Sequence, residues 1–362
     1  MKSRQWIALG LLAFVPLAAA AEHLGWGQNS VFFFSAVAIV PLAVWLSTAT
    51  EELSIALGPA VGSLLNALFG NATELIIALA ALRAGLGEIV KASITGTVMA
   101  NLLLALGLSM LIGGLGRREQ VFQPVVARVN GSAMTLAVLA ILIPSLSSLA
   151  PGASSAGNEA FSIFVAWLLL LVYALTLLFS LRTHRSLYEV AEVERQPDEA
   201  TPTPHRPATL PWLLVLLGAT VGLAYVSELF VGVIESVTAS FGFTPLFTGI
   251  VLLPLLGGVA EYITAVSMAR RNQMDLAVSV ALGSTLLMAV LVAPLLVLLG
   301  PVLGQPLDLS FNPFELVAIA TAVLVSNLVS LDGRSDWLEG VLLLTAYVIL
   351  AAGFYFQTGP VG

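Results

Sequence analysis

Apolar segments about 20 residues long recur along this 362-residue chain, and they constrain its fold more than any other feature. A helix of that length crosses the ~30 Å hydrocarbon core of a membrane. With 58% hydrophobic and 10% charged residues, the composition is that of a polytopic membrane protein, which excludes nucleic-acid binding and soluble enzymes. The chain has no cysteine, so disulfides, cysteine-ligated zinc and thiol catalysis are excluded.

The apolar segments number eleven, and we expect an all-α membrane protein with about eleven transmembrane helices. The expected spans are roughly residues 5–21, 31–50, 61–82, 90–115, 130–149, 160–181, 210–233, 244–268, 276–300, 313–330 and 337–356. No other secondary structure is expected.

The distribution of basic residues indicates how the chain is oriented, because Lys and Arg collect on the cytoplasmic side of a membrane. With a cytoplasmic N-terminus, 12 of the 14 Lys and Arg residues fall on that side, and only Arg83 and Lys91 fall on the other. This separation supports both the eleven spans and the orientation. A cleaved signal peptide is the alternative interpretation of the first span, and a retained helix is favoured.

The spans divide the chain into two similar sets. After an N-terminal helix in residues 1–30, five spans lie in residues 31–181 and five in residues 210–362. An odd number of crossings inverts the second set relative to the first, as in many secondary transporters. Residues 182–209 hold four prolines, five acids and four arginines, and we expect a mostly disordered cytoplasmic linker there. Cation sensing by its acids is the less favoured alternative.

Two spans each contain a carboxylate within a similar motif. Glu74 ends the sequence Gly-Asn-Ala-Thr-Glu at residues 70–74, and Glu261, 187 residues later, ends Gly-Gly-Val-Ala-Glu at residues 257–261. A carboxylate at bilayer depth costs about 2.5 kcal/mol or more, so two of them indicate a functional site near the midplane. An architectural role beside a buried arginine is the alternative, although neither span has Lys or Arg at similar depth.

The residues around the glutamates predict an all-oxygen site. Gly70, Gly257 and Gly258 can unwind their helices locally, and Pro254 removes a backbone donor, so that carbonyl oxygens face a cavity. Such oxygens suit a hard cation such as Ca²⁺ and no soft metal. The polar side chains expected to line the site, or alternatively to serve helix packing, are Asn71, Thr73, Thr97, Asn101, Ser284 and Thr285.

The same carboxylates also suit protons. Two carboxylates buried together resist being charged at once, so protons should replace a departing cation. We therefore hypothesise cation/proton antiport by alternating access, in which the protein changes face only when the glutamates are neutralised. Glu51 and Glu228 are expected to attract cations toward the pair. For Glu52 and Glu235, the interpretation as ordinary acids at helix ends carries equal weight.

Several of these motifs resemble a known family. Residues 65–76, preceded by Ala-Thr-Glu-Glu at 49–52 and followed by residues 99–107, resemble the first repeat of the cation/proton exchangers of the calcium/cation antiporter superfamily. The likeness extends over about residues 31–356. It implies an eleven-helix calcium/proton antiporter of a bacterial inner membrane, with Glu74 and Glu261 as the cation and proton site. It implies no cofactor beyond the transported Ca²⁺, and the oligomeric state stays open.

The second half departs from the family pattern. Members usually carry Asn after the first glycine and His after the glutamate, where this chain has Gly258 and Tyr262, and Leu287 stands where Gln is expected. These changes remove a ligand from half of the site, which leaves the cation selectivity open. If the missing side chain weakens the site, restoring Asn at position 258 should raise the Ca²⁺ affinity.

Other functions fit the sequence less well. An exchanger of Na⁺, K⁺, Mn²⁺ or Mg²⁺ against protons is the nearest alternative. A passive channel is disfavoured because channels usually line a pore by oligomeric symmetry rather than by an internal repeat. An intramembrane hydrolase is a remote alternative, since the spans contain no His and the chain has no His-Glu-x-x-His motif.

Overall fold

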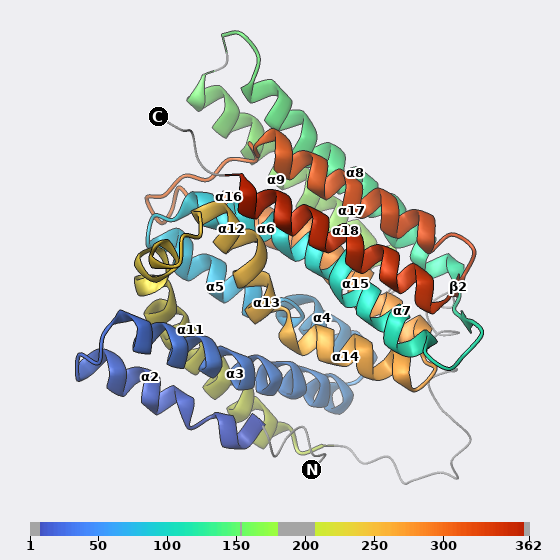
Figure 1. Cartoon of the computed structure of the whole chain (residues 1–362), viewed down its shortest axis with the longest axis horizontal. Helices are drawn as coiled ribbons and strands as arrows, with labels where there is room; N and C mark the ends of the chain where they lie inside the picture. The colour runs from blue at the N-terminus through green and yellow to red at the C-terminus, as the bar shows by residue number, and fades with distance from the viewer. Residues whose placement is uncertain (1–7, 153, 180–206, 358–362) are drawn as a thin grey trace.

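The structure is a computed structural model that describes residues 8–152, 154–179 and 207–357 (Figure 1). The first half of the chain forms α2 (Phe14–His23), α3 (Gln28–Leu57), α4 (Pro59–Phe69), α5 (Ala72–Arg83), α6 (Gly87–Met99), the π-helix η1 (Ala100–Ala105), α7 (Leu106–Gly114), α8 (Pro124–Ser148) and α9 (Ser155–Leu178). Lys2, Arg4 and linker residues 182–206 lie outside the described residues.

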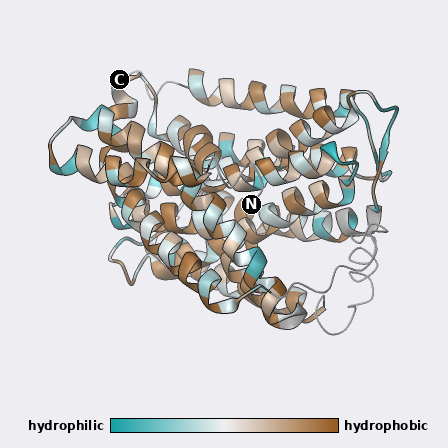
Figure 2. Cartoon of the chain, turned by 90° about the horizontal axis from the view of Figure 1, so that it is seen from below, coloured by the Kyte–Doolittle hydropathy of each residue, from teal (hydrophilic) through white to brown (hydrophobic). Residues whose placement is uncertain are grey.

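The second half of the chain is also helical. Its elements are α11 (Thr209–Ser240), α12 (Pro245–Phe247), η3 (Thr248–Leu252), α13 (Leu253–Gly257), α14 (Val259–Arg270), α15 (Met274–Leu287), η4 (Met288–Val292), α16 (Ala293–Leu299), α17 (Pro313–Val329) and α18 (Trp337–Phe356). Connecting loops at the ends of the helices carry much of the hydrophilic surface, whereas the helices between them are mainly hydrophobic (Figure 2).

Seven helices among the described residues are long and apolar enough to cross a membrane. They are Gln28–Leu57, Gly87–Gly114, Arg128–Ser148, Ser155–Leu178, Thr209–Ser240, Met274–Leu299 and Trp337–Phe356. An eighth candidate is the pair Pro245–Gly257 and Val259–Arg270, which is bent by 60° at its break. Ala8–His23 and Pro313–Val329 are shorter apolar helices. The polytopic helical class is confirmed, and the count of eleven stays a prediction.

One feature corrects the all-α prediction. Two short strands, β1 (Gln120–Val121) and β2 (Arg334–Ser335), pair antiparallel with Gln120 opposite Ser335. They join the loop after α7 to the loop before α18. This pairing cannot be predicted from the sequence, because two residues are too few for the alternating pattern that identifies a strand.

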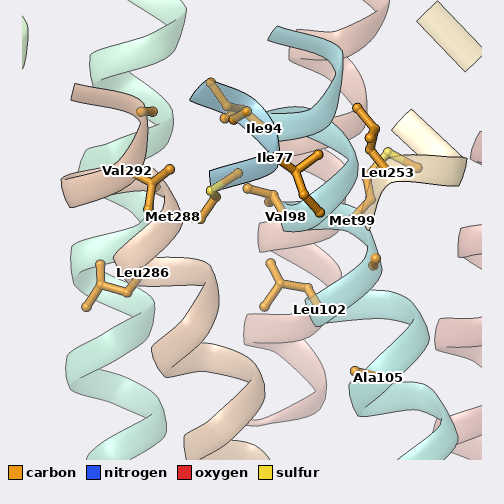
Figure 3. Close-up of a cluster of buried hydrophobic side chains, with 14 of the residues drawn as sticks. Ile77, Ile94, Val98, Met99, Leu102, Ala105, Leu253, Leu286, Met288 and Val292 are labelled. Atoms are coloured by element: carbon orange, nitrogen blue, oxygen red, sulfur yellow. The ribbon is translucent and has the colours of Figure 1, made fainter. Parts of the chain in front are cut away.

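Helices from the two halves of the chain pack against each other in reciprocal pairs. α5 contacts α11 while α14 contacts α3, and α6 contacts α17 while α15 contacts α8. In the same way, α7 contacts α18 and α16 contacts α9. Apolar side chains form much of the contact between the halves: Ile77 of α5, Val98 of α6 and Leu253 of α13 lie in one buried cluster with side chains of α15 and η4 (Figure 3).

Interruptions of the helices lie at corresponding places in the two halves. One helix is broken between α4 and α5 and the other between α13 and α14. The π-helices η1 and η4 also correspond, and such bulges are frequent at functional sites. Gly96 allows α6 to approach η3 closely, because a Cβ there would lie 2.6 Å from the carbonyl carbon of Ile250. The second broken helix, which runs from η3 into α13, thereby packs against α6.

Candidate functional site

The two glutamates occupy equivalent positions just after the helix breaks. Glu74 lies in the first turn of α5, and Glu261 lies in the first turn of α14. The first four backbone N–H groups of a helix have no partner within it, so this end of a helix favours negative charge. Each break therefore supplies an electrostatic environment in which a buried carboxylate is tolerated.

The structure brings the two carboxylates together. Glu74 is only 6% exposed, Glu261 is half-buried, and the two carboxyl groups lie close enough to interact electrostatically. Gly257 permits this approach, because a Cβ there would lie 3.2 Å from Cγ of Glu74. Within the described part of the chain, neither glutamate forms an ion pair with Lys or Arg. The predicted architectural alternative thus lacks its basic partner.

Ser284 of α15 organises the polar groups around the pair. Its hydroxyl donates to Oε2 of Glu261 at 2.9 Å. It also accepts hydrogen bonds from Nδ2 of Asn71 at 2.8 Å and Nδ2 of Asn101 at 2.9 Å. The hydroxyl has a single proton, and it donates that proton in the hydrogen bond to Glu261. Both amides must therefore turn their NH₂ groups toward the hydroxyl oxygen. Their oxygens are consequently directed away from Ser284.

This arrangement leaves several buried oxygens without a protein donor. Oδ1 of Asn71, Oδ1 of Asn101 and Oε1 of Glu74 are buried, and none of them has a hydrogen-bond partner among the described residues. Buried polar atoms in native proteins are nearly always satisfied, so such a group calls for an explanation. A hard cation, which binds oxygen ligands, is one partner that could satisfy such atoms.

The remaining predicted lining residues differ in their placement. Thr73 and Thr97 are buried in the same spans as the site. The Thr285 hydroxyl donates to the carbonyl of Ala281 in its own helix at 2.8 Å, which uses its only proton. Leu287 packs beside Gly70, where a Cβ would lie 3.4 Å from its Cδ1 atom.

One carbonyl near the second break is not free. Pro254 accepts hydrogen bonds at its carbonyl oxygen from the backbone N–H of Gly258 at 2.9 Å and from the Tyr262 hydroxyl at 2.8 Å. Sequence reasoning treated Tyr262 only as the loss of a histidine. It missed the contact because the direction of a tyrosine ring depends on packing rather than on spacing.

The two acids predicted to attract cations lie away from the pair. Glu228 forms an ion pair with Arg83 at 2.9 Å, and the two side chains are 56% and 64% exposed. Glu51 is exposed on α3. Neither is brought into contact with Glu74 or Glu261, so their role stays a prediction.

A third buried carboxylate was missed as a candidate. Glu315 is 3% exposed, and its oxygens accept from the Thr95 hydroxyl at 3.2 Å and from the backbone N–H of Asn312 at 3.0 Å. It is the third residue of a capping box that begins α17. The sequence Asn-Pro-Phe-Glu at residues 312–315 carries the signal for this box, so capping accounts for this carboxylate.

Comparison with known proteins identifies the family. The profile described as "Sodium/calcium exchanger protein" matches residues 29–182 and 211–356, which together make up most of the chain. The chain belongs to this family. The resemblance to cation/proton exchangers of the wider superfamily is therefore confirmed.

Two relatives of the sodium/calcium exchanger family match over nearly their whole lengths. A Ca(2+)/H(+) antiporter of Aphanothece halophytica is 49% identical, over 99% of this chain and 98% of its own. The Ca(2+)/H(+) antiporter ChaA of Bacillus subtilis is 42% identical, over 95% of this chain and 97% of its own. These relatives are named as transporters, as expected for a protein that is not an enzyme.

Solved structures agree with the fold. Native YfkE superposes with a TM-score of 0.83 at 37% identity, covering 98% of this chain and all of its own. The H+/Ca2+ exchanger CAX superposes with a TM-score of 0.70 and covers 98% of this chain and 92% of its own. At 15% identity, the second match supports the fold alone.

Proposed function

We propose that this protein is a secondary active antiporter that exchanges Ca²⁺ for H⁺ across the membrane. The observation that carries the proposal is the adjoining pair of Glu74 and Glu261, which has no basic partner among the described residues. The names of the two relatives are consistent with it.

The proposed cation ligands are all oxygen atoms. Two carboxylates supply the charge, and the amide oxygens of Asn71 and Asn101 are already oriented by Ser284. Ca²⁺ takes six to eight oxygen ligands in flexible geometry, so backbone carbonyls or water would complete its shell. Preorientation matters because amides that are already turned lose little freedom when the cation binds.

Protons would occupy the same site when the cation leaves. Two adjacent carboxylates in a medium of low dielectric constant repel each other strongly, so at least one must be neutralised. The two carboxyl groups are close enough for the charge of one to oppose the charge of the other. Binding of the cation and binding of protons would therefore exclude each other, and this competition couples the two fluxes.

We further propose eleven crossings arranged as two inverted five-helix repeats that move against each other. The reciprocal helix contacts, the matched breaks and the matched π-helices support this arrangement. Alternating access by relative movement of inverted repeats around a central site is common in secondary transporters.

The distribution of Lys and Arg supports a proposed topology with a cytoplasmic N-terminus, in a bacterial inner membrane, and contacts at the helix ends support the grouping of the loops on two faces. Arg117 donates to the carbonyl of Arg270 at 3.0 Å, so two loops that the sequence assigns to the cytoplasm meet. On the side assigned to the exterior, Lys91 pairs with Asp308 at 2.6 Å. If the predicted number of membrane crossings between two of these loops were wrong by one, the paired residues would lie on opposite sides of the membrane and could not meet.

Proton flux in liposomes tests the proposal. Purified protein in acid-loaded liposomes would be titrated with Ca²⁺, Mg²⁺, Mn²⁺, Na⁺ and K⁺, alongside the Glu74→Gln variant and Glu228→Gln as a control carboxylate outside the pair. Ca²⁺-selective proton release, lost in Glu74→Gln and kept in Glu228→Gln, is expected. Proton release driven by another cation would support cation/proton exchange but would show that Ca²⁺ is not the substrate. If no cation drove proton release, both the exchange mechanism and the Ca²⁺ substrate would be refuted.

A further inference from the structure

Tyr262 spans the second helix break. Its side chain is 8% exposed, and its hydroxyl on α14 reaches back to the carbonyl oxygen of Pro254 on α13 at 2.8 Å. The two helix segments are bent by 60° at Gly258. Because helical side chains lean toward the N-terminus of their helix, a residue at position 262 covers the turn that contains position 258.

Gly258 is what allows the ring to lie there. A Cβ at position 258 would lie 2.5 Å from Cζ and 2.8 Å from Cε1 of Tyr262, and nearer still to its hydroxyl oxygen. Those separations are shorter than real contacts of a Cβ atom. The tyrosine ring therefore fills the space that a side chain at position 258 would need, and the two residues form one packing unit.

The first half of the chain uses the same two positions differently. Asn71 stands where Gly258 stands, and Leu75 stands where Tyr262 stands, with an offset of 187 residues. The Asn71 side chain reaches Ser284 and keeps a buried oxygen free. At position 258 of the second half there is no amide, and the Tyr262 hydroxyl instead donates a hydrogen bond to a backbone carbonyl, that of Pro254.

We propose that Tyr262 is a positioning residue that sets cation affinity by keeping the Pro254 carbonyl bonded within the protein and by excluding a ligand side chain at position 258. This inference rests on the proposed function for its effect on the cation, whereas the packing unit stands without it. A cation in the site would then take its neutral side-chain ligands from the first half of the chain.

The geometry also revises an expectation from the sequence. An asparagine at position 258 was expected to raise the Ca²⁺ affinity, but Tyr262 leaves no room for it. Overpacked sites are destabilised because neighbouring side chains are forced out of favourable conformations. The gain in affinity is therefore expected only when position 262 changes as well.

The hydroxyl is tested by Tyr262→Phe, which keeps the ring and removes a single oxygen. The change frees one lone pair of the Pro254 carbonyl oxygen. The Ca²⁺ concentration for half-maximal proton flux should therefore fall about fivefold, which corresponds to the free energy of one ordinary hydrogen bond. The maximal flux should not change. The matched control is Tyr347→Phe, because Tyr347 is also buried and its hydroxyl has no hydrogen-bond partner in the described structure. If the Ca²⁺ concentration for half-maximal proton flux in Tyr262→Phe were unchanged or higher, the proposal would be overturned.

The packing unit is tested by a double-mutant cycle that places the residues of the first half, Asn and Leu, at positions 258 and 262. We expect Gly258→Asn to lower Tm by several degrees without Ca²⁺, and the same change in a Tyr262→Leu background to lower it much less. The Ca²⁺-dependent rise in Tm should be larger in Tyr262→Leu than in the wild type, because the Pro254 carbonyl is freed, and larger still in the double variant, which also gains an amide oxygen. Additive changes in Tm would refute the packing unit. Non-additive changes in a protein without Ca²⁺/H⁺ exchange would instead refute the proposed function alone.

Discussion

Replacing Ser284 with alanine removes the group that orients the neutral ligands of the proposed site. The change deletes one hydrogen bond to Glu261 and two from Asn71 and Asn101, with lengths of 2.8 to 2.9 Å. At about 1 kcal/mol net for each bond, the free energy of unfolding should fall by roughly 3 kcal/mol.

The effect on cation binding follows from the freed amides. Without the serine hydroxyl, Asn101 no longer has a partner that fixes its orientation, and Asn71 keeps only the long hydrogen bond of 3.4 Å from its Nδ2 to the backbone carbonyl of residue 284, which holds it weakly. Two amides with two orientations each would place both oxygens correctly in about one quarter of molecules. The apparent Ca²⁺ affinity should therefore fall about fourfold, with the maximal rate largely kept because both carboxylates are still present.

The assay is the Ca²⁺ dependence of proton flux in liposomes, together with thermal unfolding of the purified protein. Thr285→Val is a matched control, since it removes a neighbouring buried hydroxyl that bonds only within its own helix. A Ca²⁺ affinity in Ser284→Ala equal to that of Thr285→Val would refute the idea that this serine orients the amides. A complete loss of flux in a folded protein would also contradict it, because it would make the hydroxyl indispensable.

Three further predictions test the carboxylates and the packing around them. Glu74→Gln and Glu261→Gln should each abolish exchange while the protein keeps its elution profile in detergent, because each leaves only one ionisable group in the site. Gly96→Ala should unfold the protein or sharply reduce its yield, since α6 has no room for a methyl group against η3, whereas the corresponding Gly283→Ala should be tolerated because its Cβ would meet no atom within 4 Å. Glu228→Gln should change the Ca²⁺ dependence of proton flux less than twofold, since its ion pair with Arg83 is exposed on both sides.

The sequence predicted those features that depend on the cost of burying a charge or of breaking a helix. Glu74 and Glu261 could be identified because a carboxylate in an apolar span is energetically costly and is kept only where it has a function. Gly70 and Gly258 indicated the helix breaks beside them. The meeting of the two carboxylates followed from the predicted inversion of the second half. These inferences need only spacing and hydrophobicity.

The details that the sequence could not supply depend on side chains from different helices. Ser284 was predicted only as a lining residue, since nothing in its surroundings indicates that amides from α6–η1 and from the first break converge on it. The pairing of β1 with β2 was likewise invisible. The role of Tyr262 depends on the absence of a side chain four residues earlier, which becomes meaningful only once the ring is placed.

The proposed site is symmetric in its acids and asymmetric in its neutral ligands. Each half supplies one glutamate, but both amides, Asn71 and Asn101, come from the first half, where the second has Gly258 and Met288 at the corresponding positions. Protons require only the carboxylates, whereas a cation also requires neutral oxygens to complete its shell. Substitution of either asparagine should therefore weaken cation binding while proton binding persists. Cation selectivity in this protein would then depend on the first half of the chain, and proton coupling on both.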